Sequence, residues 1–216
     1  MYILGLTGSI GMGKTTAARA FKTLGIPVYD ADTTIHKLMN ENNAVVAEIK
    51  KIFPEAVKNN IIDRNILGSM VFGDMSVLKE LEKILHPRAR VLQYKFMRCA
   101  AKNRQNIIVL DIPLLFETKG DQFCDAVIVV SAPSFVQRSR VLARANMTEK
   151  KFTEICNRQL SDKEKRIRAN YIIPTGLGKS VSLTYIKKII KDVKTKNGYK
   201  WLPRKGLYIE TNSTRY

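Results

Sequence analysis

Near its start the chain carries the stretch Gly8-Ser9-Ile10-Gly11-Met12-Gly13-Lys14-Thr15. It fits the pattern G-x-x-x-x-G-K-[ST] with one further glycine inside it, a spacing that lets backbone N–H groups turn inward around an anion. The apolar run at 2–6 predicts a strand before it, and residues 15–24 predict a helix after it, whose first amides add positive potential at the same place. In that context the stretch predicts a nucleoside triphosphate site; the alternative is a Gly-rich turn that matches by chance.

Two side chains of this stretch have predicted tasks. Lys14 can reach the β- and γ-phosphates, and the Thr15 hydroxyl can ligate Mg²⁺. ATP and Mg²⁺ are therefore the expected ligands. The predicted nucleotide-binding residues of this region are Gly8, Ser9, Ile10, Gly11, Met12, Gly13, Lys14, Thr15 and Thr16.

Length and composition limit the class of protein. A chain of 216 residues, 45% of them hydrophobic, suits one α/β domain with an elaboration, or two small lobes that share a core. No apolar stretch approaches the roughly 20 residues of a membrane span, and the first residues do not resemble a signal peptide. The three cysteines form no C-x-x-C pair, which argues against a disulfide framework or a zinc site. We expect a cytoplasmic protein.

The formal net charge of +18 indicates attraction to anions. Nucleotides, coenzymes, RNA and membrane surfaces all qualify, so charge alone does not choose a partner. A nucleotide-dependent protein that binds RNA or DNA is an alternative of another class. The sequence contains no recognisable nucleic-acid module, so we expect no specific nucleic-acid partner.

Five short apolar runs predict the strands of the core. They are continuous and rich in β-branched residues, which is typical of strands buried on both faces of a parallel sheet, and helical patterns lie between them. The chain is thus expected to be an α/β protein with a five-stranded parallel sheet. The runs lie at 2–6, 27–29, 107–110, 126–130 and 171–173.

The long gap after the second strand predicts an insertion. Helices are expected at 44–53, at 76–85 with Ser76 as its N-cap, and from Pro87 towards Lys102. This gap has the right size for a helical substrate-binding insertion, although a decorative insertion would look similar. Two basic helices at 137–168 predict a lid, and a last helix is expected at 182–193. The predicted parts are a core at 1–35 and 103–193, an insertion at about 36–102, the lid, and a loosely attached basic tail at 194–216.

Acidic residues follow two of the predicted strands. Asp30 and Asp32 come directly after the second strand, and ligands of open α/β sheets bind outside the carboxyl ends of the strands. We expect one of them to cap the following helix and Asp32 to accept a proton from an acceptor hydroxyl. Asp111 ends the third strand, in the position of a Mg²⁺-binding acid, and Glu117 follows near the mouth of the crevice.

Two arginines in the predicted lid can stabilise phosphoryl transfer. Arg140 and Arg144 lie four residues apart, which predicts one helical face. An arginine can clamp the charge that develops on the γ-phosphate, and a closing lid excludes water. A solvated basic face is the alternative. His86 is more credible as a hydrogen-bond donor to a substrate than as a base.

Further motifs extend over most of the chain, in a specific order. They are Asp30-Ala31-Asp32, His86-Pro87-Arg88-Ala89-Arg90, Asp111-Ile112-Pro113-Leu114-Leu115-Phe116-Glu117, and then Gln137, Arg140, Arg144, Arg158-Gln159 and Lys165-Arg166. Together with the first stretch, this set resembles the dephospho-CoA kinase family, a family of P-loop kinases, from about residue 1 to 173.

The resemblance implies transfer from ATP to the ribose 3′-hydroxyl of dephospho-CoA, the last step of coenzyme A synthesis. It would make Asp32 the base, Lys14 and Arg140 the charge clamps, and Arg144 a lid residue that binds ATP. The insertion would hold the coenzyme. The residues implied on the acceptor side are Asp32, His86, Arg90, Leu114 and Glu117, and the metal ligands are Thr15 and Asp111.

One segment departs from the family pattern. After the last strand this chain has Pro174-Thr175 where the family usually shows an Asp-Asn-like pair near the adenine. Contacts to the base are therefore expected to differ. Another kinase of this architecture, with a nucleoside or a sugar as acceptor, is the nearest alternative.

Overall fold

The computed structural model describes residues 1–71 and 74–201. Its core is a five-stranded sheet with the strand order β2-β5-β1-β6-β7, and every neighbouring pair is parallel. The predicted α/β class and the five predicted strands are confirmed, and each strand continues one residue further than expected. The strands are β1 (Tyr2–Thr7), β2 (Val28–Asp30), β5 (Ile107–Asp111), β6 (Ala126–Ser131) and β7 (Tyr171–Pro174).

Apolar side chains cover both faces of this sheet. On one face, alternate residues such as Leu4 and Ile128 pack with Phe21 of α1 (Lys14–Thr23) and Ile186 of α9 (Lys179–Val193). On the other face, Ile3 and its neighbours pack against the segment after β5 and the end of α5 (Met75–Lys102). Burial on both faces explains why the strands are continuous apolar runs.

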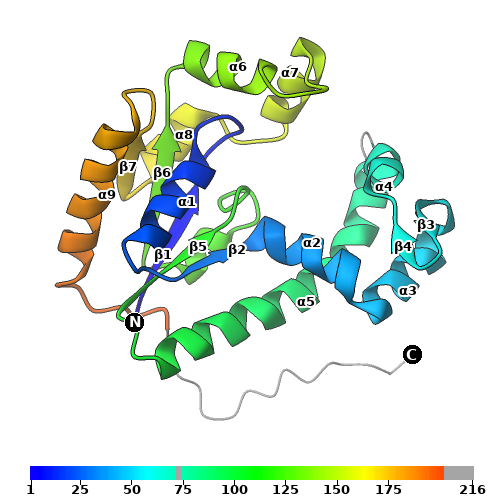
Figure 1. Cartoon of the computed structure of the whole chain (residues 1–216), viewed down its shortest axis with the longest axis horizontal. Coiled ribbons are helices and arrows are strands. Elements are labelled where there is room, and N and C mark those ends of the chain that lie inside the picture. The colour runs from blue at the N-terminus through cyan, green and yellow to red at the C-terminus, as the bar shows by residue number, and fades with distance from the viewer. Residues whose placement is uncertain (72–73, 202–216) are drawn as a thin grey trace.

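The insertion lies to one side of the sheet and has its own apolar cluster (Figure 1). Helices α2 and α5 pack together and connect the sheet to the rest of the insertion. Besides α5, its elements are α2 (Ala31–Glu41), α3 (Asn43–Ile52), η1 (Pro54–Ala56), β3 (Val57–Lys58), β4 (Ile61–Ile62) and α4 (Arg64–Val71). The predicted helix at 44–53 is confirmed as α3, shifted by one residue at each end.

The insertion is not purely helical, which corrects the prediction. Strands β3 and β4 form an antiparallel hairpin. Asn59 and Asn60 connect them with φ of 50° and 58°, and asparagine tolerates this left-handed region better than most residues. Two-residue strands carry too little periodicity to be recognised in a sequence, but the Asn-Asn pair was a usable turn signal.

The two helices predicted around Pro87 are one helix. Helix α5 passes through Pro87, and its N-cap is Asp74, not Ser76; the Asp74 carboxylate accepts from the backbone N–H of Ser76 and Val77. Proline removes one helical hydrogen bond, which predicts a break. Here burial of apolar residues in the preceding turns, such as Leu81, Ile84 and Leu85, holds the helix together.

The predicted lid contains three helices, not two. They are α6 (Ser134–Leu142), α7 (Glu149–Asn157) and α8 (Asp162–Arg168). New helices begin where Thr148 caps α7 and where Ser161 forms a capping box with Glu164, since these side chains satisfy the first free amides. Helix α9 begins three residues before the predicted position. A short turn, η2 (Gly120–Phe123), precedes β6.

The first part of the predicted tail packs on the core, which corrects the expectation of loose attachment. Asp125 accepts hydrogen bonds from the backbone N–H of Tyr199 and Lys200 at 2.7 and 2.9 Å. Trp201 packs beside Tyr94, with 5.6 Å between ring centroids. Residues 202–216 of that tail lie outside the described residues. Within the described ranges, no helix is long and apolar enough to cross a bilayer.

Candidate active site

The phosphate loop (residues 8–15) connects the carboxyl end of β1 to the start of α1. Gly11 and Gly13 have φ of 77° and 87°, a conformation that other residues adopt only with strain. A Cβ atom added at Gly13 would lie 3.2 Å from the side chain of Thr175. Glycine therefore allows both the turn and the close approach of the loop to the end of β7.

Thr175 fixes the phosphate loop to the edge of the sheet that β6 and β7 form. Its buried hydroxyl donates to Met12 O at 2.7 Å, and its backbone N–H donates to Ser131 O at 2.8 Å. The sequence singled out 174–175 only as a departure near the expected adenine position. The structure places Thr175 in the wall of the site, where this one residue joins the loop to the ends of β6 and β7.

Arg140 is held at the same point. Its guanidinium donates to Thr175 O at 2.7 Å and to the Thr175 hydroxyl at 3.3 Å. Arg144 lies beyond the end of α6, because the helix stops at Leu142 and Ala143 is its C-cap. The prediction that both arginines share a helical face is therefore wrong, although both line the same cavity.

Lys14 forms a short ion pair with Asp111. Lys14 Nζ lies 2.7 Å from Asp111 Oδ1, and the Asp111 side chain is 3% exposed. Burial raises the pKa of Asp111 above its usual value, and the positive charge of Lys14 opposes that rise. Asp30 and Asp32 raise the same pKa further through their negative charge, as expected where parallel strands end side by side.

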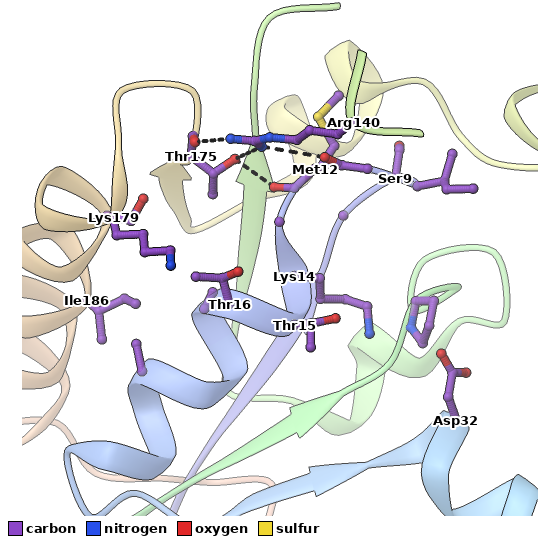
Figure 2. Close-up of a pocket in the computed structure, with 18 of the residues that line it drawn as sticks. Ser9, Met12, Lys14, Thr15, Thr16, Asp32, Arg140, Thr175, Lys179 and Ile186 are labelled. Carbon is purple, nitrogen blue, oxygen red and sulfur yellow. Dashed lines mark hydrogen bonds between the residues drawn. The ribbon is translucent and has the colours of Figure 1, made fainter. Parts of the chain in front are cut away.

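Asp30 and Asp32 lie in different surroundings, and one of the two caps the following helix, as expected. Asp30 is the N-cap of α2, and its carboxylate accepts from Thr33 N at 2.9 Å. Asp32 lies in the first turn of α2 and lines the cavity of the phosphate loop. In Figure 2, the Lys14 side chain extends from the start of α1 towards Asp32 on α2. A carboxylate and the lysine of the phosphate loop therefore line one cavity.

That space is a cavity of about 800 Å³ lined by the whole phosphate loop, Asp32, Arg140 and Arg144. Three of its other wall residues were not predicted to bind: Gln159, Thr175 and Lys179. Lys179 extends from α9 towards Thr16 on α1 (Figure 2). Gln159 belongs to the quoted motifs and Thr175 to the segment expected near the adenine, but neither had been given a binding role. Lys179 had no signal in the sequence.

Apart from Asp32, the predicted acceptor residues do not line this cavity. His86 and Arg90 lie on α5, beside Ala89, whose carbonyl accepts from the Tyr29 hydroxyl at 3.1 Å. That contact brings their part of α5 to the end of β2. Leu114, which is 39% exposed, follows β5, and its neighbour Pro113 is the residue of that segment that reaches the cavity wall.

Glu117 has structural partners. Its Oε1 lies 2.9 Å from Nζ of the buried Lys165 and accepts from Leu160 N, also at 2.9 Å. Its Oε2 is buried and has no hydrogen-bond partner within the described part of the chain. Glu117, which was predicted to lie near the mouth of the crevice, thus packs between the segment after β5 and helix α8.

The described residues contain no cluster of three or more His, Cys, Asp or Glu side chains that could hold a metal ion. The predicted ligands Thr15 and Asp111 are nevertheless of the right chemistry for Mg²⁺, which is usually held by one or two carboxylates together with substrate phosphates. The Lys14 contact brings the buried Asp111 carboxylate next to the phosphate loop. The donor set fits a phosphate-bound magnesium ion better than an all-protein metal site.

Comparison with known proteins identifies one family of similar sequences. A family model described as dephospho-CoA kinase matches residues 2–177. The dephospho-CoA kinase of Paramagnetospirillum magneticum is 49% identical over 166 residues, which cover 77% of this chain and 78% of that protein.

Two solved structures have a similar fold. The crystal structure of TT1252 from Thermus thermophilus superposes with a TM-score of 0.79 at 32% identity, covering 90% of this chain and 98% of that one. Dephospho-CoA kinase from Campylobacter jejuni gives a TM-score of 0.60 at 26% identity, covering 88% of this chain and 96% of the other.

Proposed function

The chain belongs to the dephospho-CoA kinase family, and from that premise we propose how its cavity transfers the γ-phosphoryl group of ATP to the ribose 3′-hydroxyl of dephospho-CoA. The observation that carries the proposal is that Lys14, at the start of α1, and Asp32, in the first turn of α2, line one cavity. Phosphoryl transfer depends on such positioning, because the attacking and leaving oxygens must lie roughly in line.

The nucleotide side is built from the phosphate loop. Its backbone and Lys14 would hold the β- and γ-phosphates, with Thr16 and Arg144 contributing at the same cavity. Thr15 and Asp111 would hold Mg²⁺, which when bound neutralises charge on the phosphate oxygens. Lys14 is held within reach by its ion pair with Asp111, so the amine is available when a triphosphate enters.

The chemical step moves one proton and one phosphoryl group. The Asp32 carboxylate accepts the proton of the 3′-hydroxyl while that oxygen forms a bond to the γ-phosphorus. The bond from the γ-phosphorus to the bridging oxygen breaks, and ADP leaves. Arg140, fixed by Thr175, would stabilise the charge that develops on the transferred group.

The acceptor side lies towards the insertion. His86 and Arg90 on α5, with Leu114 after β5, would contact dephospho-CoA. The Tyr29–Ala89 hydrogen bond supports this assignment, because it fixes that part of α5 beside the strand that leads to Asp32. Glu117 belongs to the same proposed set by resemblance.

An acceptor panel tests the proposal. ADP release is measured with dephospho-CoA, with several nucleosides and with sugar acids, each with Mg²⁺ and with excess chelator. We expect turnover with dephospho-CoA that requires Mg²⁺, and no comparable turnover with any other acceptor. Equal or faster turnover of a nucleoside or a sugar would replace the proposed substrate, and full activity in chelator would remove the magnesium site.

A further inference from the structure

A buried ion pair lies behind the wall of the nucleotide cavity. The Lys165 side chain on α8 is 0% exposed, and its Nζ lies 2.9 Å from Glu117 Oε1. The amine also donates to Pro113 O at 3.4 Å. Neither Glu117 nor Lys165 is among the cavity-lining residues. A buried charge is costly unless it is paired, so a pair in this place calls for a reason.

Leu160 connects this pair to the phosphate loop. Its N–H donates to Glu117 Oε1 at 2.9 Å, and its carbonyl accepts from the Ser9 hydroxyl at 3.4 Å. Leu160 lies between α7 and α8, where the chain leaves the lid. One residue therefore contacts the ion pair through its N–H and the loop through its carbonyl.

The neighbouring residue makes the second connection. Gln159 Oε1 accepts from the backbone N–H of Ile10 at 3.0 Å, and the Ile10 carbonyl accepts from Gln137 Nε2 at 2.8 Å. Ser9, Ile10 and Gln159 all line the nucleotide cavity. The loop tip is thus held by Gln137 of α6 and by the connection between α7 and α8, and the ion pair fixes that connection in turn.

Glu117 has little left to offer to a ligand. Its Oε1 already accepts from Lys165 and from Leu160, and its Oε2 is buried from solvent. An acceptor molecule could reach this carboxylate only if the ion pair and the Leu160 contact were broken. The contacts therefore favour a role within the protein.

We propose that Glu117 and Lys165 are positioning residues for the nucleotide side of the site. Through Leu160 and Gln159 they hold Ser9 and Ile10 of the phosphate loop, and Glu117 does not contact the acceptor. This inference rests on the proposed function, and it changes the role of Glu117 within it.

The substitutions Glu117→Gln and Lys165→Met, singly and together, test this inference. Each single change leaves one buried group without its charged partner, while the double change removes both charges. The dissociation constant of a non-hydrolysable ATP analogue is titrated without acceptor, and kcat and both KM values are measured separately. We expect each single variant to weaken analogue binding roughly tenfold, with the KM for dephospho-CoA changed less than about twofold, and the double variant to recover most of the loss.

Two further variants complete the experiment. Lys163→Met makes the same change at an exposed position of α8 and should bind the analogue as wild type does. Gln159→Ala removes the hydrogen bond to Ile10 N without leaving a buried charge. It therefore replaces a single variant of the ion pair that does not fold. It should weaken analogue binding and leave the KM for dephospho-CoA unchanged.

Three results would overturn the inference. They are a raised KM for dephospho-CoA in Glu117→Gln with unchanged analogue binding, a double variant no better than the singles, and unchanged analogue binding in Gln159→Ala. Failure of the proposed function is a separate result, because wild type would then fail to phosphorylate dephospho-CoA while the acceptor-free titration would still report on the loop.

Discussion

The sheet core and the insertion are held together in different ways. In the core, residues far apart in the chain meet at the site, as in the hydrogen bond from Thr175 to Met12 across 163 positions. The insertion builds its apolar cluster from one continuous part of the sequence, and α2 and α5 connect it to the sheet. A locally built unit can open without unfolding the rest. The difference suggests that nucleotide binding depends on the core and acceptor binding on the insertion.

The largest effect is expected at Asp32, where the two regions meet. Asp32→Asn removes the proposed proton acceptor, so kcat should fall by about 10²–10⁴, while the affinity for a non-hydrolysable ATP analogue changes little. Rapid-quench kinetics and analogue titration measure the two quantities. Asp30→Asn is the matched control, because asparagine also caps helices and should leave kcat nearly intact. Activity retained in Asp32→Asn would show that the base is misassigned.

The next effect separates the core from the insertion. Lys14→Ala removes the cation of the phosphate loop, and kcat should fall by about 10²–10³ together with weaker ATP binding. Binding of dephospho-CoA, measured by titration, should be preserved. Lys22→Ala, an exposed lysine on the same helix, is the control. An enzyme indifferent to the loss of Lys14 would contradict the nucleotide site.

The same variant has a pH signature. Burial already raises the pKa of Asp111, and Lys14 is the partner that lowers it, so its removal should raise that pKa further. A carboxyl whose pKa is higher in the folded than in the unfolded state makes stability fall as the pH rises through that range. Urea unfolding of Lys14→Ala at several pH values should show a loss relative to wild type that grows with pH. A loss that shrinks with pH would contradict this account of Asp111.

A cavity in each region tests their independence directly. Ile49→Ala in the insertion and Ile128→Ala in β6 both remove a side chain that is 0% exposed, and each should cost about 2–5 kcal/mol of unfolding free energy. In Ile49→Ala, hydrogen exchange should increase mainly in the insertion and the KM for dephospho-CoA should rise. In Ile128→Ala, exchange should increase in the core and ATP binding should weaken. The same exchange pattern in both variants would mean that the two regions unfold as one unit.

The smallest effect concerns a helix end in the insertion. Asn42 caps α3 by accepting from Ala44 N and Val45 N. Asn42→Ala should lower the unfolding free energy by about 1 kcal/mol with no change in kcat. Thermal denaturation measures it, with Lys51→Ala, an exposed residue of the same helix, as control. A loss of kcat would mean that the insertion is coupled more tightly to the chemistry than its local packing suggests.

The same contrast explains how far the sequence could be interpreted. The strands and the phosphate loop were predictable because continuous apolar runs and glycine spacing are set by local backbone geometry and by burial on both faces. The passage of α5 through Pro87 was not, because tertiary packing around Leu85 outweighs the local signal of proline. The task of Asp30 as a cap and the place of Asp32 followed from their position after β2.

Other parts of the site could not be inferred from patterns. Thr175, Gln159 and Lys179 enter the cavity from elements distant in the chain, and no spacing rule connects them to the loop. Resemblance placed Glu117 on the acceptor side, whereas its contacts with Lys165 and Leu160 are visible only in the folded chain. Motifs indicated what chemistry to expect. Long-range contacts within the protein determine which polar atoms remain available to bind a ligand.

The central claim is that ATP held by the phosphate loop phosphorylates a ribose alcohol presented beside Asp32. Its most direct test is the structure of the product, determined by phosphorus–proton correlation NMR after incubation with ATP, Mg²⁺ and dephospho-CoA. The account predicts one new phosphate on the 3′ oxygen for each ADP released. Phosphate on another oxygen, or ADP release without a phosphorylated acceptor, would contradict it.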